Sequence, residues 1–424
     1  MDSTNTEWKK GAFSDFVEIN PKRRVSIDRP VKFISMEAVE PNYKFATSFE
    51  KRIFKGGCKF RNRDTLFARI TPSLEHGKTC YVNFLDKDEA GAGSTEFIVF
   101  SGKKGFTEPE YVYYLSRTDM VRNPAIQSMS GTSGRQRVDT SVFRDIEISI
   151  PPILEQLKIS TILKDLDSKI ELNRKMNQTL ESIAQTLFKH WFIDFEFPDE
   201  NGQPYKSSGG EMVFSNELGK EIPREWLYGN ILDIADLLSG GTPKTKVQEY
   251  WDGGIPWVSA KDASNSNGTF ILQTERTISQ RGLENSNANL LPKNTTIITA
   301  RGTVGKCCIL PMEMSINQSN YGLKAKNGFG DFFIFFCVKL LVNIMKSRSY
   351  GTVFDTITTS TFRDVKLLIP PLSVVRSFEY LANTFMGKLL QNIGQIKILS
   401  DIRDSLLPKL ISGKIRVPLE DTDV

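Results

Sequence analysis

The sequence predicts an α+β protein built from two similar domains, each followed by one long helix. Three observations support this: a long internal repeat, strand-like runs inside each copy, and a heptad pattern after each copy. Residues 141–152 read SVFRDIEISIPP and residues 360–371 read STFRDVKLLIPP. Phe143 matches Phe362 at a constant shift (362 − 143 = 219). Solenoid repeats recur every ~20–50 residues, so a period this long indicates a duplicated domain.

Length and composition are those of an ordinary globular chain. The 424 residues allow roughly two to four domains. A net charge of +5 permits a nucleic-acid partner without requiring one. No apolar run approaches the roughly 20 residues of a membrane helix, and the N-terminal residues lack a signal-peptide core. We therefore expect a cytoplasmic protein.

Cysteine and histidine usage argues against a metal site. The five cysteines form no C-x-x-C pair, and the chain has only two histidines. Structural zinc needs clustered cysteine and histidine ligands. We therefore predict no metal site and expect reduced thiols.

Each copy carries the same order of predicted elements. TEFIVF (95–100) and TTIITA (295–300) are rich in β-branched and aromatic residues, which is typical of strands. Residues 108–117 and 332–346 each predict one helix at matching places in the two copies. A shared scaffold with diverged loops indicates one task directed at two targets.

A proline pair closes each copy and a heptad pattern follows. Proline suits the first turn of a helix but not its interior. Apolar residues then recur at alternating spacings of 4 and 3, from Ile159 to Trp191 and from Phe378 to Leu410. This 3.5-residue period is typical of coiled coils. We predict helices over 154–191 and 373–410 that pack antiparallel on each other.

Asn173 and Asn392 occupy the same position of the heptad pattern, near the middle of each predicted helix. A polar residue buried between paired helices fixes their register at some cost in stability. In an antiparallel pair the two midpoints meet. We therefore expect these two asparagines to set the coiled-coil register and to lie near each other.

These features resemble the DNA specificity subunit of type I restriction–modification systems. The resemblance covers essentially the whole chain. It rests on the W-x₆-D openings at Trp8 and Trp226, the segment Phe67-Ala68-Arg69, and the two I-P-P segments with their helices. The second copy departs from the first where Val374-Val375 replaces Glu155-Gln156. That difference affects the contacts at the helix start but not the fold.

The resemblance implies an architecture and a set of partners. Two α/β target recognition domains would sit inverted, with pseudo-two-fold symmetry, on an antiparallel coiled coil. Each would read one half of a bipartite site in double-stranded DNA. The helices would dock two methyltransferase (modification) subunits, which bind S-adenosylmethionine, and restriction subunits would join them. The chain itself would need no cofactor. The implied divisions are recognition domain 1 (1–150), central helix (151–197), linker and lead-in (198–225), recognition domain 2 (226–369), C-terminal helix (370–413) and tail (414–424).

The candidate DNA-binding residues lie in polar loops of each domain. Arg, Lys, Asn and Gln side chains make the useful contacts with base edges, while phosphate contacts position the protein. The candidates are Arg61, Arg63, Arg69, Lys78, Arg135 and Arg137 in the first domain, and Lys261, Arg301, Thr303, Lys306, Asn317 and Asn320 in the second.

Catalytic signatures are missing from the sequence. An adenine methyltransferase needs an (N/D)-P-P-(Y/F) segment, but this chain has IPPI (150–153) and IPPL (369–372). ARGTVGKC (300–307) lacks the first glycine of a phosphate-binding loop and ends in cysteine. No clustered acidic metal ligands indicate a nuclease. We predict a non-catalytic subunit with no catalytic residues.

One alternative from another functional class stays open. The chain could be a coiled-coil adaptor that presents two β-rich modules to proteins rather than to DNA. Net charge does not separate the two functions. Salt does, because the logarithm of DNA affinity falls linearly with the logarithm of salt concentration.

Overall fold

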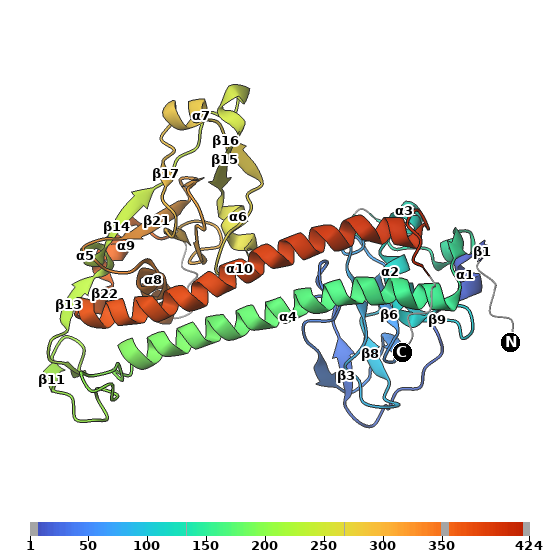
Figure 1. The fold of residues 1–424 in the computed structure, drawn as a ribbon, viewed down its shortest axis with the longest axis horizontal. Helices are drawn as coiled ribbons and strands as arrows, with labels where there is room; N and C mark the ends of the chain where they lie inside the picture. Colours follow the sequence, from blue (N-terminus) through green and yellow to red (C-terminus); the bar gives the residue numbers. More distant parts are fainter. Residues whose placement is uncertain (1–6, 133, 267, 349–355, 419–424) are drawn as a thin grey trace. The chain divides into compact units, whose positions relative to one another are not determined.

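The computed structural model describes residues 7–132, 134–266, 268–348 and 356–418 (Figure 1). The predicted tail, 414–424, therefore lies partly outside the described residues. The chain divides into two compact units. The first joins residues up to 174 with residues from 395 onward, and the second holds 175–394. Each unit thus takes one part of each long helix.

The first copy of the repeat, called the first repeat below, forms three small sheets. They have the strand orders β1-β10, β2-β9-β6-β7 and β4-β3-β8-β5. The elements are β1 (Lys9–Ala12), α1 (Phe13–Phe16), β2 (Val17–Ile19), β3 (Val31–Ile34), β4 (Glu50–Arg52), β5 (Cys58–Phe60), β6 (Thr65–Ala68), β7 (Thr79–Tyr81), β8 (Gly91–Gly93), β9 (Phe97–Gly102), α2 (Pro109–Ser116), α3 (Asp119–Gln127), η1 (Thr140–Arg144) and β10 (Glu147–Ile150).

The second repeat has sheets with the orders β13-β22, β14-β21-β18-β19 and β16-β15-β20-β17. Its elements are β13 (Leu227–Asn230), α5 (Ile231–Ile234), β14 (Ala235–Ser239), η2 (Gln248–Tyr250), β15 (Trp251–Val258), α6 (Ala260–Asn265), β16 (Arg276–Ile278), α7 (Gln280–Glu284), β17 (Leu290–Leu291), β18 (Thr296–Thr299), β19 (Cys307–Ile309), β20 (Met314–Ile316), β21 (Asn320–Ala325), α8 (Asp331–Arg348), α9 (Thr359–Asp364) and β22 (Lys366–Ile369).

The two repeats share one topology, strand for strand. Strand β3 pairs parallel with β8, and β15 pairs parallel with β20, while the other pairings within these sheets are antiparallel. In these two parallel pairs, Phe33 of β3 lies opposite Ala92 of β8, and Trp257 of β15 lies opposite Ser315 of β20. The duplicated α+β fold predicted from the sequence is confirmed. Helices α6 and α7 are additions of the second repeat.

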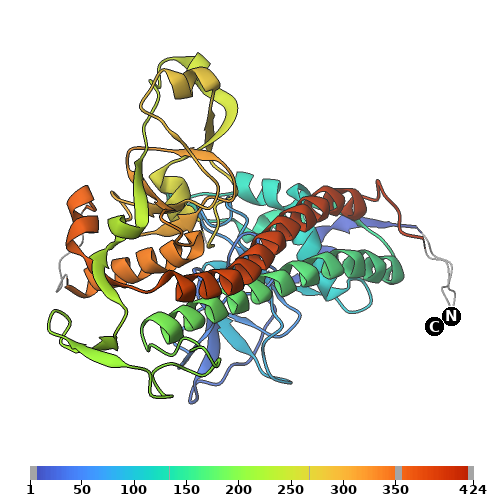
Figure 2. The same ribbon diagram turned by 60° about the vertical axis from the view of Figure 1, so that its left-hand side comes forward.

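Two helices of 40 residues follow the repeats, α4 (Ile153–Phe192) and α10 (Leu372–Ile411). Both begin directly after a proline pair, as the sequence predicts. In the first unit Asp167 of α4 bonds Arg403 of α10. In the second unit Asn392 of α10 bonds Asn177 of α4. Early residues of one helix thus meet late residues of the other, so the halves run antiparallel and side by side within each unit (Figure 1, Figure 2).

The segment between α4 and the second repeat is folded rather than extended. A hairpin of β11 (Met212–Ser215) and β12 (Lys220–Pro223) occupies the predicted lead-in. Upstream of the hairpin, Tyr205 stacks on Phe197 with ring centroids 4.5 Å apart. In the part of the chain that the structure describes, no helix is long and apolar enough to cross a membrane.

Candidate nucleic-acid interface

Two candidate arginines lie in the turn between β5 and β6. The backbone N–H of Arg61 donates to Asp64 (2.8 Å), which fixes the turn, and the Arg61 side chain is exposed. Arg63 adopts a positive φ of 74°. Its guanidinium is 65% exposed and lies 3.5 Å from a carboxylate oxygen of Glu108. Both side chains therefore remain exposed to solvent, and only a long contact with Glu108 restrains Arg63.

The structure brings three other candidates of the first repeat together. The loop after β6 forms a bridge with a later segment, in which Ile70 pairs with Arg137. The guanidinium of Arg137 donates twice to the Glu96 carboxylate, at 2.9 Å from Nε and 2.7 Å from Nη2. The hydrogen bonds to Glu96 raise the pKa of Arg137. The backbone N–H of Arg69 donates to the Glu96 carbonyl (2.9 Å), and Arg135 lies exposed beside this cluster.

Arg69 and Lys78 are more enclosed than the sequence suggested. One terminal nitrogen of Arg69 donates to the Val138 carbonyl at 3.2 Å. The ammonium of Lys78 donates to the Met36 carbonyl at 3.0 Å. Both side chains are half-buried and hold loops against the sheets. They position the surface formed by Arg135 and Arg137.

The loop from Ala300 to Lys306 joins β18 to β19 and carries three candidates of the second repeat. The side chains of Arg301, Thr303 and Lys306 are exposed. The base of the loop is fixed, because the Thr299 hydroxyl accepts from the Lys306 backbone N–H at 2.9 Å and also donates to the Thr303 carbonyl. A loop with a fixed base can present its exposed polar side chains to a binding partner in a defined arrangement. In the first repeat the corresponding loop joins β6 to β7.

The other candidates of the second repeat differ in exposure. Asn320 is only 1% exposed, and its amide donates to the Val258 carbonyl (3.1 Å) and to the Asn317 side chain (3.0 Å). These bonds tie the start of β21 to the end of β15. Lys261 lies on α6, with its side chain 68% exposed, and pairs with Glu275 at 2.8 Å. Asn317 and Asn320 thus hold the loop, whereas Lys261 faces solvent.

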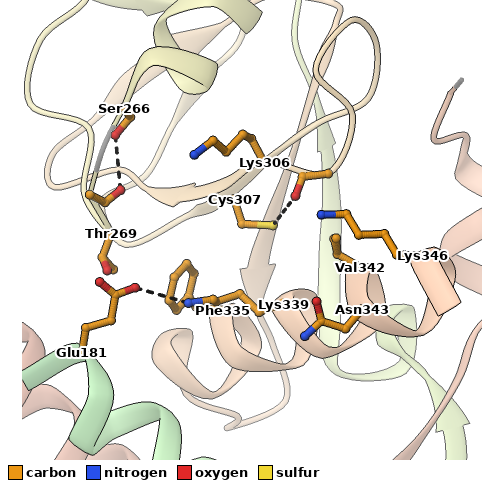
Figure 3. A pocket seen from close by; sticks show the side chains of 12 residues that line it. Glu181, Ser266, Thr269, Lys306, Cys307, Phe335, Lys339, Val342, Asn343 and Lys346 are labelled. Carbon is orange, nitrogen blue, oxygen red and sulfur yellow. Dashed lines mark hydrogen bonds and ion pairs between the residues drawn. The ribbon is translucent and has the colours of Figure 1, made fainter. Parts of the chain in front are cut away.

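Sequence reasoning missed a set of polar side chains that surround Lys306. A cavity of ≈ 270 Å³ lies between the β18–β19 loop and α8, and Lys339, Asn343 and Lys346 line it (Figure 3). These positions are spaced 4 and 3 apart, so they share one helix face, and that spacing was a readable signal. Glu181 balances one charge by pairing with Lys339 at 3.3 Å.

Cys307 also lines this cavity. Burial raises the pKa of its thiol to about 12, so the group stays neutral near pH 7. The thiol points toward the Gly305 carbonyl at 3.7 Å (Figure 3). Cys307 therefore lines the cavity as a neutral group, and the lysines give the cavity its positive charge.

The two register asparagines are buried between the helices, each 1% exposed. The Asn173 amide donates to Gln395 at 3.1 Å within the first unit. The Asn392 amide donates to Asn177 at 2.9 Å within the second unit. Each asparagine thus bonds across the helix pair: Asn173 to Gln395, which lies outside the heptad series, and Asn392 to Asn177, which belongs to it.

No group of three or more histidine, cysteine, aspartate or glutamate side chains that could hold a metal occurs among the described residues. The fold and its exposed cations define a class of protein: duplicated α+β domains with cationic loops, each followed by one of two paired helices. The family model for the type I restriction modification DNA specificity domain matches residues 5–182 and 223–404. The chain belongs to this family, and it is a specificity subunit rather than a catalytic one.

Individual relatives agree with this assignment. The chain is 29% identical over 318 residues to the type I restriction enzyme MjaIX specificity subunit of Methanocaldococcus jannaschii, covering 73% of this chain and 69% of that protein. It is 27% identical over 405 residues to the HindI specificity subunit of Haemophilus influenzae, covering 83% and 86%. A crystal structure of a type I restriction–modification S subunit from M. genitalium is similar in fold, with a TM-score of 0.57, 15% identity and coverage of 97% and 98%.

Proposed function

We propose that the chain reads a bipartite sequence in double-stranded DNA, one half with each repeat. The observation that carries this proposal is that exposed cationic side chains lie beside or on the same loop of a duplicated scaffold. In the first repeat, the exposed Arg135 and Arg137 lie beside the loop joining β6 to β7. In the second repeat, Arg301 and Lys306 lie on the loop joining β18 to β19. Two surfaces of one design with different side chains suit two different half-sites.

The reading surfaces are proposed from exposure. In the first repeat, Arg135 presents donors beside the loop that Arg69 anchors, and Arg137, which Glu96 holds, lies next to it. In the second repeat, Arg301 and Thr303 lie on the exposed loop. Arginine can donate two hydrogen bonds to guanine in the major groove, which distinguishes it from the other bases.

The remaining candidates take supporting roles in the proposal. Other exposed cations suit phosphates, which position a protein without reading sequence. Arg61, Arg63, Lys261 and Lys306 fit this role, and Lys306 has the cationic cavity behind it. Lys78, Asn317 and Asn320 hold the loops in place through backbone carbonyls or each other.

The helix pair is proposed as the docking site for two methyltransferase subunits, with restriction subunits joining the complex. Both long helices expose large apolar side chains, although exposed apolar groups are scattered singly on most surfaces. They are Leu154 (67%), Leu157 (43%), Ile162 (38%), Leu172 (51%) and Ile183 (43%) on α4, and Tyr380 (76%), Ile398 (60%) and Ile402 (41%) on α10. S-adenosylmethionine would bind the methyltransferase subunits, and the complex would work in the cytoplasm.

A selection experiment tests the proposal. The chain, purified with its methyltransferase subunits, is incubated with duplexes of random sequence, and the retained DNA is sequenced. We expect two short motifs separated by a constant spacer. Affinity should fall steeply with salt, because phosphate contacts release counterions. If no motif were retained, and if the chain bound proteins with an affinity independent of salt concentration, the adaptor function would be favoured instead.

A further inference from the structure

A buried ion pair joins the long helices in the first unit. Asp167 of α4 and Arg403 of α10 meet at 2.7 Å, with side chains 2% and 1% exposed. The Tyr114 hydroxyl donates to the other oxygen of Asp167 at 2.7 Å. Lys44 in turn donates to Tyr114 at 2.9 Å. The charges therefore belong to a hydrogen-bonded network inside the core.

The second unit has no such pair at the equivalent positions. The shift of 219 that relates the two repeats turns Asp167 into Met386 and Arg403 into Ala184. Met386 and Ala184 are both fully buried in the apolar core of the second unit. One design thus carries a charge pair in the first unit and an apolar pair in the second.

This difference has a consequence for which helices can pair. Suppose α4 paired in the same antiparallel register with α4 of a second copy. Asp167 would then meet Ala184, and its charge would be buried without Arg403. If α10 paired with α10 of a second copy, Arg403 would meet Met386. Removing one partner of a buried ion pair is strongly destabilising because the other charge stays buried alone, whereas an apolar pair in its place is often neutral or better.

The partners of the two asparagines also differ between the helices. The shift of 219 turns Gln395, the partner of Asn173, into Met176, and it turns Asn177, the partner of Asn392, into Ile396. Pairing of like helices would therefore place each buried asparagine amide against an apolar side chain. That loss affects neutral groups, whereas loss of the ion pair leaves a buried charge without its partner.

We propose that the Asp167–Arg403 pair makes helix pairing selective, directing α4 to α10 and against a second copy of itself. The pair thereby keeps the two different repeats in one assembly and disfavours assemblies of two identical repeats. This inference concerns the choice of partner helix and does not depend on what the repeats bind.

The test uses the full chain with a protease site inserted at the exposed turn between Asn201 and Gly202. Cleavage leaves two halves held together by the helices. Native mass spectrometry then counts unlike and like pairs after incubation at a concentration where the halves exchange. We expect the cleaved protein with its native helices to give unlike pairs almost entirely.

The chain with Asp167→Met and Arg403→Ala gives the first unit the apolar pair of the second. We expect its like-paired fraction to rise by about tenfold or more, since each 1.4 kcal/mol of preference is a factor of ten. The matched control, Asp165→Met with Lys409→Ala, removes one acid and one base from exposed positions of the same helices. It should keep unlike pairing. Equal like-paired fractions in the native and apolar-pair proteins would overturn the proposal.

A second variant guards against misfolding of the first. Asp167→Arg with Arg403→Asp reverses the pair, so its two halves still match each other. Mixed with the cleaved native protein, its halves should fail to exchange, because each cross-pair places like charges together. Exchange at the rate seen between two native samples would overturn the proposal as well.

Discussion

The two places where a repeat joins the long helices share a backbone plan but not their chemistry. At the first junction, polar side chains of α4 hold the repeat through hydrogen bonds. At the second, aromatic rings of both helices pack against α8. The difference teaches that the duplicated topology tolerates either solution, and that chemistry at the junction can diverge for another purpose, such as distinguishing the two halves.

The first junction is centred on Gln156. Its side-chain oxygen accepts from the Glu108 backbone N–H at 2.8 Å, and its amide donates to the Phe106 and Pro151 carbonyls, each at 2.8 Å. Glu155 beside it is fully buried and accepts from Trp8 at 3.2 Å. All these groups are satisfied, which is the condition under which a buried polar network stabilises a fold.

The second junction is centred on Phe378, which is fully buried. Its ring lies 5.1 Å from that of Phe192 and 5.8 Å from that of Phe188, both on α4. Glu379, next in the chain, accepts from the backbone N–H groups of Phe332 (3.1 Å) and Phe333 (3.0 Å). It thereby caps the start of α8, which favours a negative charge there.

The largest effect is expected at the aromatic junction. Phe378→Ala should lower the free energy of unfolding by about 4 kcal/mol, because it removes a buried ring and leaves a cavity. Urea denaturation followed by fluorescence would measure it. Tyr380→Ala is the control, since this side chain is 76% exposed and should cost less than about 0.5 kcal/mol. Similar losses in the two variants would contradict the packing described.

At the charged pair, Arg403→Met should cost about 3 kcal/mol, since Asp167 then stays buried without its cation. The combination Asp167→Met with Arg403→Met should recover most of the loss. The same denaturation experiment checks both. The single variant Asp167→Met completes the comparison. If the loss of unfolding free energy in the double variant equalled the sum of the losses in the two single variants, the ions would not act as a pair.

A smaller effect is expected from exchanging the junctions at one position. Gln156→Val copies the second repeat, where Val375 stands, and should cost about 2 kcal/mol because the buried Glu108 N–H loses its acceptor. Val375→Gln places an amide in the apolar junction and should also destabilise, by about 1–3 kcal/mol. If either exchange were neutral in thermal unfolding, the junctions would not be chemically distinct.

The smallest effect concerns pH. Burial raises the pKa of Glu379, although the backbone N–H groups of Phe332 and Phe333 oppose the shift. The folded state thus binds this proton more tightly than the unfolded state. The stability that the protonated Glu379 side chain contributes is therefore fully present below the ordinary pKa of a glutamate. It is lost as the pH rises through the pKa of Glu379 in the folded state. Glu379→Gln should remove that part of the dependence, seen as a flatter plot of urea midpoint against pH. An unchanged slope would argue against the shift.

Much of the fold could be predicted because it depends on periodic patterns. The repeat shift and the heptads located both long helices to within one residue at each end. The proline pairs marked the helix starts. These signals are local in sequence, so they survive without knowledge of the tertiary structure.

The site was less predictable because loop side chains choose partners that are distant in sequence. Asn320 is a DNA-binding candidate because it lies in a polar loop, but its side chain is buried and donates to the Val258 carbonyl. Arg137 is held by Glu96, which lies 41 positions away. The cross-helix partner Gln395 of Asn173 could not be read from heptad phase alone. Lys339 and Lys346 of α8 could have been placed on one helix face from their spacing in the sequence.

The central claim is that each repeat reads its own half of the DNA site. The most direct test compares selected motifs for the native complex, for Arg301→Ala and for Arg135→Ala. We predict that each variant loses preference at positions of one half only, a different half for each, by about 1–3 kcal/mol at a contacted base. The spacer and the other half should stay unchanged. Altered preferences in both halves from either single variant would contradict the claim.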